Sequence, residues 1–235
     1  MEVKYLISQD VDPYINLATE AELMSHVEPN IVILFLWQNK NTIVIGRNQR
    51  VDAECKVEDF LQNGGLIARR RSGGGAVYHD LGNLNYSIIC KSNVVEQYHY
   101  HQIVIKALSG YGLKAEFNGR NDILLGDKKV SGNATYDDGD VVCQHGTILI
   151  DSSIETMKRF LTPDTSKLER NHVSSVESRV TNLAEVLKTI TVENMKRALI
   201  KAMCATPFEY DENKAIKGKY VALFSSNKWI YRGMK

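Results

Sequence analysis

The chain has 235 residues, a length typical of one domain, and its 29 Lys and Arg against 28 Asp and Glu give a formal charge of +1. A balance this close to zero argues against a general nucleic-acid or membrane-surface binder. An apolar share of 43% with 24% charged residues excludes disordered, collagen-like and coiled-coil chains. Because no apolar stretch reaches the roughly 18–20 residues of a membrane span, we expect a soluble globular protein.

The first residues, MEVKYLISQDVDPY, lack both the apolar core of a secretory signal and the Arg-rich start of a transit peptide. The four cysteines are widely spaced and form no C-x-x-C pair, which favours reduced thiols. They are Cys55, Cys90, Cys143 and Cys204. We therefore expect a cytoplasmic protein.

The first half of the chain contains short apolar runs and one amphipathic segment. Residues 13–27 predict a helix, because Pro13 suits a first helical position and the apolar residues fall mostly on one face. The runs 31–37 and 42–46 are rich in β-branched residues and are separated by QNKN, which predicts a hairpin. Further strands are predicted at 3–9, 66–70, 76–79 and 84–90, and a short helix at 56–62.

The second half continues the same pattern. Strands are predicted at 122–126, 128–136 and 141–150, and the polar turn at 137–140 joins the last two. Strands come in runs of two or three and do not alternate singly with helices, which predicts an α+β fold with mixed, largely antiparallel sheets and flanking helices. No repeat or linker divides the chain, so we expect one domain over residues 1–235. Helices are predicted at 98–111, 154–161, 182–188 and 192–204.

The segment Arg69-Arg70-Arg71-Ser72-Gly73-Gly74-Gly75 has the composition of an anion-binding loop. Three adjacent glycines are costly to order and suit a sharp turn or a close approach of backbone to a ligand. Their N–H groups can point together at an anion, and arginine supplies forked donors for phosphate or carboxylate. A flexible surface loop beside a solvated basic strand is an equally good interpretation of this segment alone. It matches neither a Walker loop nor G-x-G-x-x-G.

Two further segments carry polar residues of interest. Lys129, in KKVSGNA, could project an ammonium into a cleft, where it would stabilise a phosphate or an activated carboxylate, although an exposed hairpin turn is the simpler interpretation. His145, in QHGT, is more often a structural histidine, and no second ligand at metal-site spacing accompanies it. No G-x-S-x-G motif is present.

Taken in order, these segments resemble the lipoate–protein ligase family of the biotin/lipoyl ligase superfamily. The resemblance covers residues 3–187 and continues more weakly to Trp229. The motifs that carry it are DPYINLATE, LFLWQN with TIVIGRNQ, ARRRSGGGAVYHDLGN, GRNDILL with KKVSGNA, QHGTILI and SVESRVTNL. A triple-glycine loop by itself is weak support, whereas six motifs in the family's order are specific.

The resemblance implies ATP-dependent activation of lipoate to lipoyl-AMP and transfer of the lipoyl group to a lysine of an acceptor domain. Lys129 corresponds to the family's catalytic lysine, and Asp122 is a candidate Mg²⁺ ligand. The family's nucleotide contacts correspond to Arg70, Gly75, Ala76, Val77, Tyr78 and Lys129. The lipoyl group would lie against Leu17, Trp37, Gly74, His79 and Lys129. Three arginines stand where the family usually has two, so Arg69 or Arg71 could replace Arg70 as the nucleotide contact.

The implied partners are lipoyl acceptor domains, either 2-oxoacid dehydrogenase E2 subunits or the glycine cleavage H protein, and neither nucleic acid nor membrane. Full-length relatives continue into a small accessory domain, which we expect to be absent here. We therefore expect either a separate accessory protein, or a self-sufficient enzyme, or a chain that performs the transfer half only.

Four other functions compete with ligation. An ATP-independent octanoyl- or lipoyltransferase needs a cysteine nucleophile, and Cys143 stands near His145, although a small apolar inward position explains it better. A lipoyl-AMP-dependent transferase would skip the ATP step. Biotin ligase lacks support because GRGRxG is absent, and a non-catalytic carrier-protein binder would not need Lys129 and the glycines.

Overall fold

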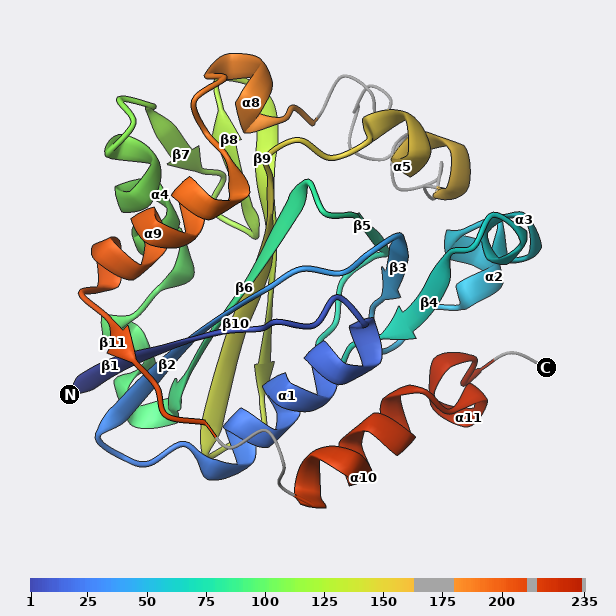
Figure 1. Cartoon of the computed structure of the whole chain (residues 1–235), viewed down its shortest axis with the longest axis horizontal. Coiled ribbons are helices and arrows are strands. Elements are labelled where there is room, and N and C mark those ends of the chain that lie inside the picture. Colours follow the sequence, from blue (N-terminus) through green and yellow to red (C-terminus); the bar gives the residue numbers. More distant parts are fainter. Residues whose placement is uncertain (163–179, 211–214, 234–235) are drawn as a thin grey trace.

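The computed structural model describes residues 1–162, 180–210 and 215–233 (Figure 1). Its main element is an eight-stranded mixed sheet in the order β11-β1-β2-β6-β10-β9-β8-β7. β11, β1 and β2 run parallel to one another, and the remaining neighbours are antiparallel. The strands are β1 Glu2–Ile7, β2 Ile31–Trp37, β6 Asn83–Lys91, β7 Ala115–Phe117, β8 Asp122–Leu125, β9 Lys128–Asp137, β10 Val141–Leu149 and β11 Thr206–Pro207.

Both faces of the central strands are covered, as the continuous apolar run of β2 requires. On one face Leu34 packs in the same cluster as Val104 and Leu199, from helices α4 (Tyr100–Ser109) and α9 (Val192–Met203). On the other, Phe35 packs in a cluster with residues of α1 (Pro13–His26) and with Phe224 of α10 (Ala215–Phe224). Figure 1 shows α4 and α9 together, and α1 beside α10. Short helices η1 (Ser92–Gln97) and α8 (Leu183–Val186) complete this part.

A second, three-stranded sheet stands beside the large one and carries the glycine-rich segment. Its order is β4-β3-β5, with β3 parallel to β4 and antiparallel to β5. The strands are β3 Thr42–Ile45, β4 Leu66–Arg69 and β5 Val77–His79. Residues of α2 (Val51–Glu54), α3 (Val57–Gln62), α5 (Ile154–Phe160) and α11 (Asn227–Ile230) pack with it around a third apolar cluster.

The predicted hairpin between 31–37 and 42–46 is wrong. β2 pairs with β1 and β6 in the large sheet, whereas β3 belongs to the small sheet. The connecting residue Asn39 is fully buried, and its side chain accepts a hydrogen bond from Asn16 (3.0 Å) and bonds His79 Nδ1 (3.2 Å). These bonds direct the chain from one sheet to the other, and Asn41 turns it with a φ of 40°.

The α+β class with a mixed, largely antiparallel sheet is confirmed, as is the turn at 137–140 between the antiparallel strands β9 and β10. Of the motif SVESRVTNL, residues 175–179 lie outside the described residues. No helix in the described part of the chain is both long and apolar enough to cross a bilayer.

Candidate functional site

A cavity of about 190 Å³ is lined by residues of both sheets and of α1. It contains most of the residues that the sequence predicted for ATP and lipoate. These are Leu17, Trp37, Arg70, Gly74, Gly75, Ala76, Val77, His79 and Lys129. Residues that are up to 112 positions apart in the chain therefore meet at one site.

Lys129 brings a cation to this cavity. It lies near the start of β9, and its side chain is about one-third exposed. Its Nζ pairs with Asp122 Oδ1 of the neighbouring strand β8 at 2.7 Å. The ammonium crosses close above Gly132, where a Cβ would lie 2.7 Å from Nζ. The glycine of KKVSGNA thus clears the path by which the lysine side chain reaches the cavity.

Arg70 holds the glycine segment (residues 73–75, called here the glycine loop) from within. Its Nη2 donates to the carbonyls of Gly73 (2.7 Å) and Gly75 (2.8 Å), and its Nη1 donates to Val44 O (3.1 Å). Burial lowers the pKa of Arg70 to about 10, and the guanidinium stays charged at neutral pH. Gly74 needs to be glycine here, because its φ is 90° and a Cβ would lie 2.9 Å from Arg70 Nη2.

The three adjacent arginines have different surroundings. Arg69 is fully buried and donates to the carbonyls of Gly46, Gln49 and Ile230, which fastens α11 to β4. Arg71 lies over the ring of Tyr136, with its Cζ 4.5 Å from the ring centroid. Of the three, Arg70 is the one that lines the cavity. Only Arg70 of the three is therefore placed to meet a ligand in this cavity.

Leu17, Trp37 and Val44 give the cavity its apolar wall. Trp37 is 4% exposed, and its Nε1 donates to Ser87 Oγ at 3.1 Å, so its indole is fixed in orientation. The ring of His79 stands edge-on to that indole, with centroids 6.1 Å apart. Such a wall suits an alkyl chain.

His79 is a neutral donor on this wall. Burial, with smaller contributions from Arg70 and His145, lowers its pKa to about 3. Asn39 Oδ1 accepts from Asn16, so Asn39 donates its amide to His79 Nδ1, and the ring proton must sit on Nε2. Among the residues that the structure describes, none forms a hydrogen bond with this buried Nε2. His79 thus brings an unpaired N–H group to a residue position that lines the cavity.

Two predicted residues do not line the cavity. Tyr78 points to the opposite side of β5 and packs edge-on against Phe60, with centroids 6.3 Å apart. Alternation along the strand explains this, because Val77 and His79 take the cavity side. Asp122 contacts the cavity only through its ion pair with Lys129.

The sequence interpretation missed several lining residues. His145, treated as structural, lines the cavity, as do Asn85, Asn121, Asn133 and Thr147. Gly146 was a usable signal, since a glycine inside a strand marks a close approach. A Cβ there would lie 2.0 Å from Asn133 Oδ1, the atom that accepts a hydrogen bond from Tyr86. Glu20 and Ser72, both buried beside His145, were not predicted either.

Cys143 is fully buried on β10 and does not line the cavity. Burial and the neighbouring Glu20 carboxylate raise the pKa of its thiol well above the ordinary range. A thiolate nucleophile is therefore disfavoured at this position.

A model of the lipoyl protein ligase A/B catalytic domain matches residues 12–204. The curated lipoate-protein ligase A of Psychrobacter cryohalolentis is 39% identical over 202 residues, which are 86% of this chain and 60% of that protein. The chain thus spans 60% of the length of this relative.

Solved structures share the fold. The structure of P. falciparum LipL1 in complex with lipoate has a TM-score of 0.84 at 31% identity and is matched over 99% of this chain and 75% of that one. A bi-partite lipoate protein ligase from Thermoplasma acidophilum, described with its E2 lipoyl domain, has a TM-score of 0.83 at 24% identity, over 100% and 98% of the two chains. A lipoate-protein ligase A bound with ATP has a TM-score of 0.83 at 23% identity, over 98% and 99%. The last two are similar in fold alone.

The residues that line the cavity, among them Trp37 and Lys129, all lie within the matched residues 12–204. The chain belongs to the lipoyl protein ligase A/B catalytic domain family.

Proposed function

We propose that this chain is a lipoate–protein ligase that activates lipoate with ATP and transfers the lipoyl group to a lysine of a lipoyl acceptor domain. One observation carries the proposal: a single cavity joins an apolar wall, containing Leu17 and Trp37, to the cationic groups of Lys129 and Arg70. An eight-carbon acid needs the apolar wall for its chain and a cation for its carboxylate. The names of the curated relative and of the LipL1 structure support this substrate.

In the first step a carboxylate oxygen of lipoate attacks the α-phosphorus of ATP. The new P–O bond replaces the bond to the bridging oxygen, and pyrophosphate leaves with that electron pair. Two anions must approach each other, and the Lys129 ammonium offsets their repulsion and the charge that develops at phosphorus. Asp122 holds this ammonium at 2.7 Å before the substrates arrive, so little reorganisation is needed.

Mg²⁺ would be held by Asp122 and by the phosphates of ATP. A lone carboxylate fits this ion, which is usually bound through one or two carboxylates together with substrate phosphates and water. Asp122 forms its ion pair with Lys129 through Oδ1, so its second oxygen is the one to consider as the ligand. When bound, the ion would neutralise charge on the leaving pyrophosphate.

The glycine loop would cover the acyl chain and keep water from the mixed anhydride. Gly74 and Gly75 line the cavity, and Arg70 holds their segment in place through carbonyl oxygens. Arg70 therefore acts on the nucleotide site in two ways, by its charge and by fixing the loop.

In the second step the ε-amine of an acceptor lysine attacks the acyl carbon of lipoyl-AMP. The C–O bond to phosphate breaks, AMP leaves, and the amine loses a proton to solvent as the amide forms. We propose E2 lipoyl domains or the glycine cleavage H protein as acceptors, and the Thermoplasma system described with its E2 lipoyl domain supports the first. We propose the cytoplasm as the place of this reaction.

A second polypeptide could assist the first step. The Thermoplasma relative is described as bi-partite, which supports a separate accessory protein. A docked partner would brace the loops around Gly75 and Lys129 in the productive arrangement. We therefore propose that such a partner raises the rate of adenylation more than it raises lipoate affinity, because the ligand contacts lie within this chain.

The test mixes purified chain, ATP, Mg²⁺, lipoate and an apo lipoyl domain, and follows pyrophosphate and the mass of the acceptor. Lipoylated acceptor with stoichiometric pyrophosphate is the expected result. Acceptor modified from preformed lipoyl-AMP but never from ATP would make the chain a lipoyl-AMP-dependent transferase. Acceptor that is modified from octanoyl carrier protein without ATP would make the chain an acyl transferase. The buried, protonated Cys143 thiol already disfavours that function.

A further inference from the structure

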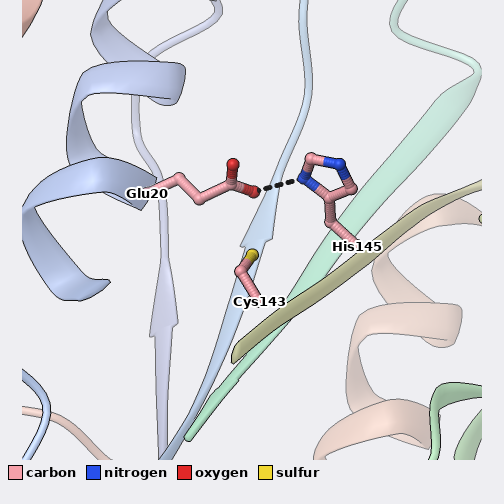
Figure 2. A group of neighbouring side chains, drawn as sticks. All are labelled: Glu20, Cys143 and His145. Atoms are coloured by element: carbon pink, nitrogen blue, oxygen red, sulfur yellow. Dashed lines mark hydrogen bonds and ion pairs between the residues drawn. The ribbon is translucent and has the colours of Figure 1, made fainter. Parts of the chain in front are cut away.

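A buried chain of hydrogen bonds runs from α1 to the segment that carries the glycine loop. Figure 2 shows Glu20 on α1 reaching the imidazole of His145 on β10, and Glu20 Oε2 lies 2.8 Å from His145 Nδ1. The other ring nitrogen, Nε2, lies 2.6 Å from Ser72 Oγ. Glu20, Ser72 and His145 are 5%, 1% and 6% exposed, so solvent does not compete for these bonds.

Glu20 is the accepting end of this series of hydrogen bonds. Burial would raise the pKa of Glu20, but the charge of His145 and hydrogen bonds from His145, Ser87 and Cys143 lower it below its ordinary value. Glu20 is therefore a carboxylate that accepts from His145 Nδ1–H. Arg70 Nε donates to Ser72 Oγ at 3.1 Å, and the same Ser72 oxygen lies within hydrogen-bond distance of His145 Nε2, so Ser72 joins the imidazole to the guanidinium.

This series of hydrogen bonds ends at Arg70, the residue that holds the glycine loop. Arg70 makes its two loop contacts through Nη2, to Gly73 O and Gly75 O. Its Nε, on another edge of the guanidinium, donates to Ser72. The position of the planar group is thus set at one side by Ser72, which in turn is fixed to the large sheet through His145.

Two other roles for these side chains fit less well. A serine, a histidine and a carboxylate in this order resemble an acyl-transfer triad. Here, however, Arg70 donates to the serine oxygen, and Ser72 does not line the cavity. Ligand atoms of Glu20, Cys143 and His145 also lie within 4.8 Å of one another, as a metal would require. Both imidazole nitrogens are already hydrogen-bonded, and the Cys143 thiol is held protonated.

We propose that Glu20, His145 and Ser72 form a positioning relay that fixes Arg70 and thereby the closed arrangement of the glycine loop. This inference rests on the proposed ligase function for its kinetic consequence. A loosened loop admits water to lipoyl-AMP, so pyrophosphate is released without lipoylation of the acceptor. The relay thus sets the coupling between ATP consumption and transfer, whereas Lys129 sets the rate of adenylation.

Ser72→Ala removes the link without reaching the cavity wall, since Ser72 is buried and does not line it. We expect the pyrophosphate released per lipoylated acceptor to rise several-fold over the wild type, and lipoate affinity to fall by roughly fivefold to tenfold, the scale of losing one ordinary hydrogen bond. Glu20→Gln keeps an acceptor oxygen for His145 and should retain most of the coupling. Cys143→Ser, a buried neighbour outside the relay, is the matched control and should leave coupling unchanged.

Hydrogen exchange of the amides at residues 70–77 gives a readout that does not depend on activity. Exchange there should be faster in folded Ser72→Ala than in the wild type, and unchanged in Cys143→Ser. Wild-type exchange and wild-type coupling in folded Ser72→Ala would overturn the relay. A fluorophosphonate adduct on Ser72 would also overturn it, in favour of a nucleophile. If the wild type never releases pyrophosphate, the proposed ligase function fails, while the exchange result still decides whether the relay holds the loop.

Discussion

Asp122 and Lys129, on the adjacent strands β8 and β9, form an ion pair of 2.7 Å at the edge of the cavity. The Asp122 side chain is 12% exposed and that of Lys129 is 31% exposed, so the carboxylate anchors an ammonium that ligands can still reach. The register between these strands shifts between Ile123 and Leu124, which places the two side chains together. A pair of this kind orients a cation in advance of its substrates.

Lys129→Ala should lower formation of lipoyl-AMP by about 10²- to 10³-fold, because a preorganised charge opposite the reacting phosphate is lost. The partly exposed side chain contributes little packing, so the variant should remain folded by circular dichroism. Lys128→Ala changes the exposed neighbour and should have little effect. Near wild-type adenylate formation by folded Lys129→Ala, measured as pyrophosphate release without acceptor, would contradict this role.

Gly74→Val should weaken lipoate binding out of proportion to its effect on stability. Its φ of 90° is strained for any residue with a side chain, and a Cβ there would press on Arg70 Nη2. Gly73→Val is the comparison, because no described atom beyond its chain neighbours lies within 4 Å of a Cβ at that position and its φ is not positive. Its effect should therefore be smaller. Calorimetric titration with lipoate checks this, and equal affinities of the two variants would refute it.

Cys143→Ser should keep most ligase activity. The thiol is fully buried with a strongly raised pKa, so it is not a thiolate at neutral pH, and serine preserves a donor toward Glu20. Mass spectrometry of the wild type after turnover should find no acyl group on Cys143. A trapped thioester there, or a folded but inactive serine variant, would support a transferase instead.

The pH dependence of stability should report His79. Its pKa falls from 6.5 in the unfolded chain to about 3 in the folded one, chiefly through burial. Below pH 6.5 the unfolded chain binds a proton on His79 that the folded state does not. The contribution of His79 to the free energy of unfolding is therefore complete above pH 6.5 and is lost as pH falls toward 3. When pH is lowered from about 7.5 to 5.5, His79 alone should reduce the free energy of unfolding by about 1.4 kcal/mol. Urea titrations of the wild type and His79→Gln at both values test this, because the variant should lose less stability by that amount.

Arg69→Met should destabilise the protein by about 3 kcal/mol or more, because several buried carbonyls would lose their donor. Arg71→Met should change the free energy of unfolding far less, since Arg71 is partly exposed and contacts mainly Tyr136. Urea denaturation gives both values. Equal effects would show that the three arginines do not have the separate roles that their contacts indicate.

The sequence by itself determined the local elements and the chemistry available to them. Helix α1 follows from Pro13 and its periodicity, and Asp12 caps it by accepting from the amides of Tyr14 and Ile15. The glycine loop and Lys129 were identified through the family resemblance, because the residues alone left a surface loop and a hairpin turn as equally good or simpler interpretations. These features depend on neighbours in the chain, and local patterns record them.

Tertiary structure alone decided which strand joined which sheet and which side chains met. The run 42–46 carries no mark that it leaves the large sheet, because the deciding bonds come from Asn16 and His79, 23 and 40 residues from Asn39. The separate roles of the three arginines and the contact between Ser72 and His145, 73 residues apart, were hidden for the same reason. Long-range contacts form only when both partners are brought together, and a hydrogen-bonding side chain is written identically in the sequence whether its partner is water, the backbone or a distant residue.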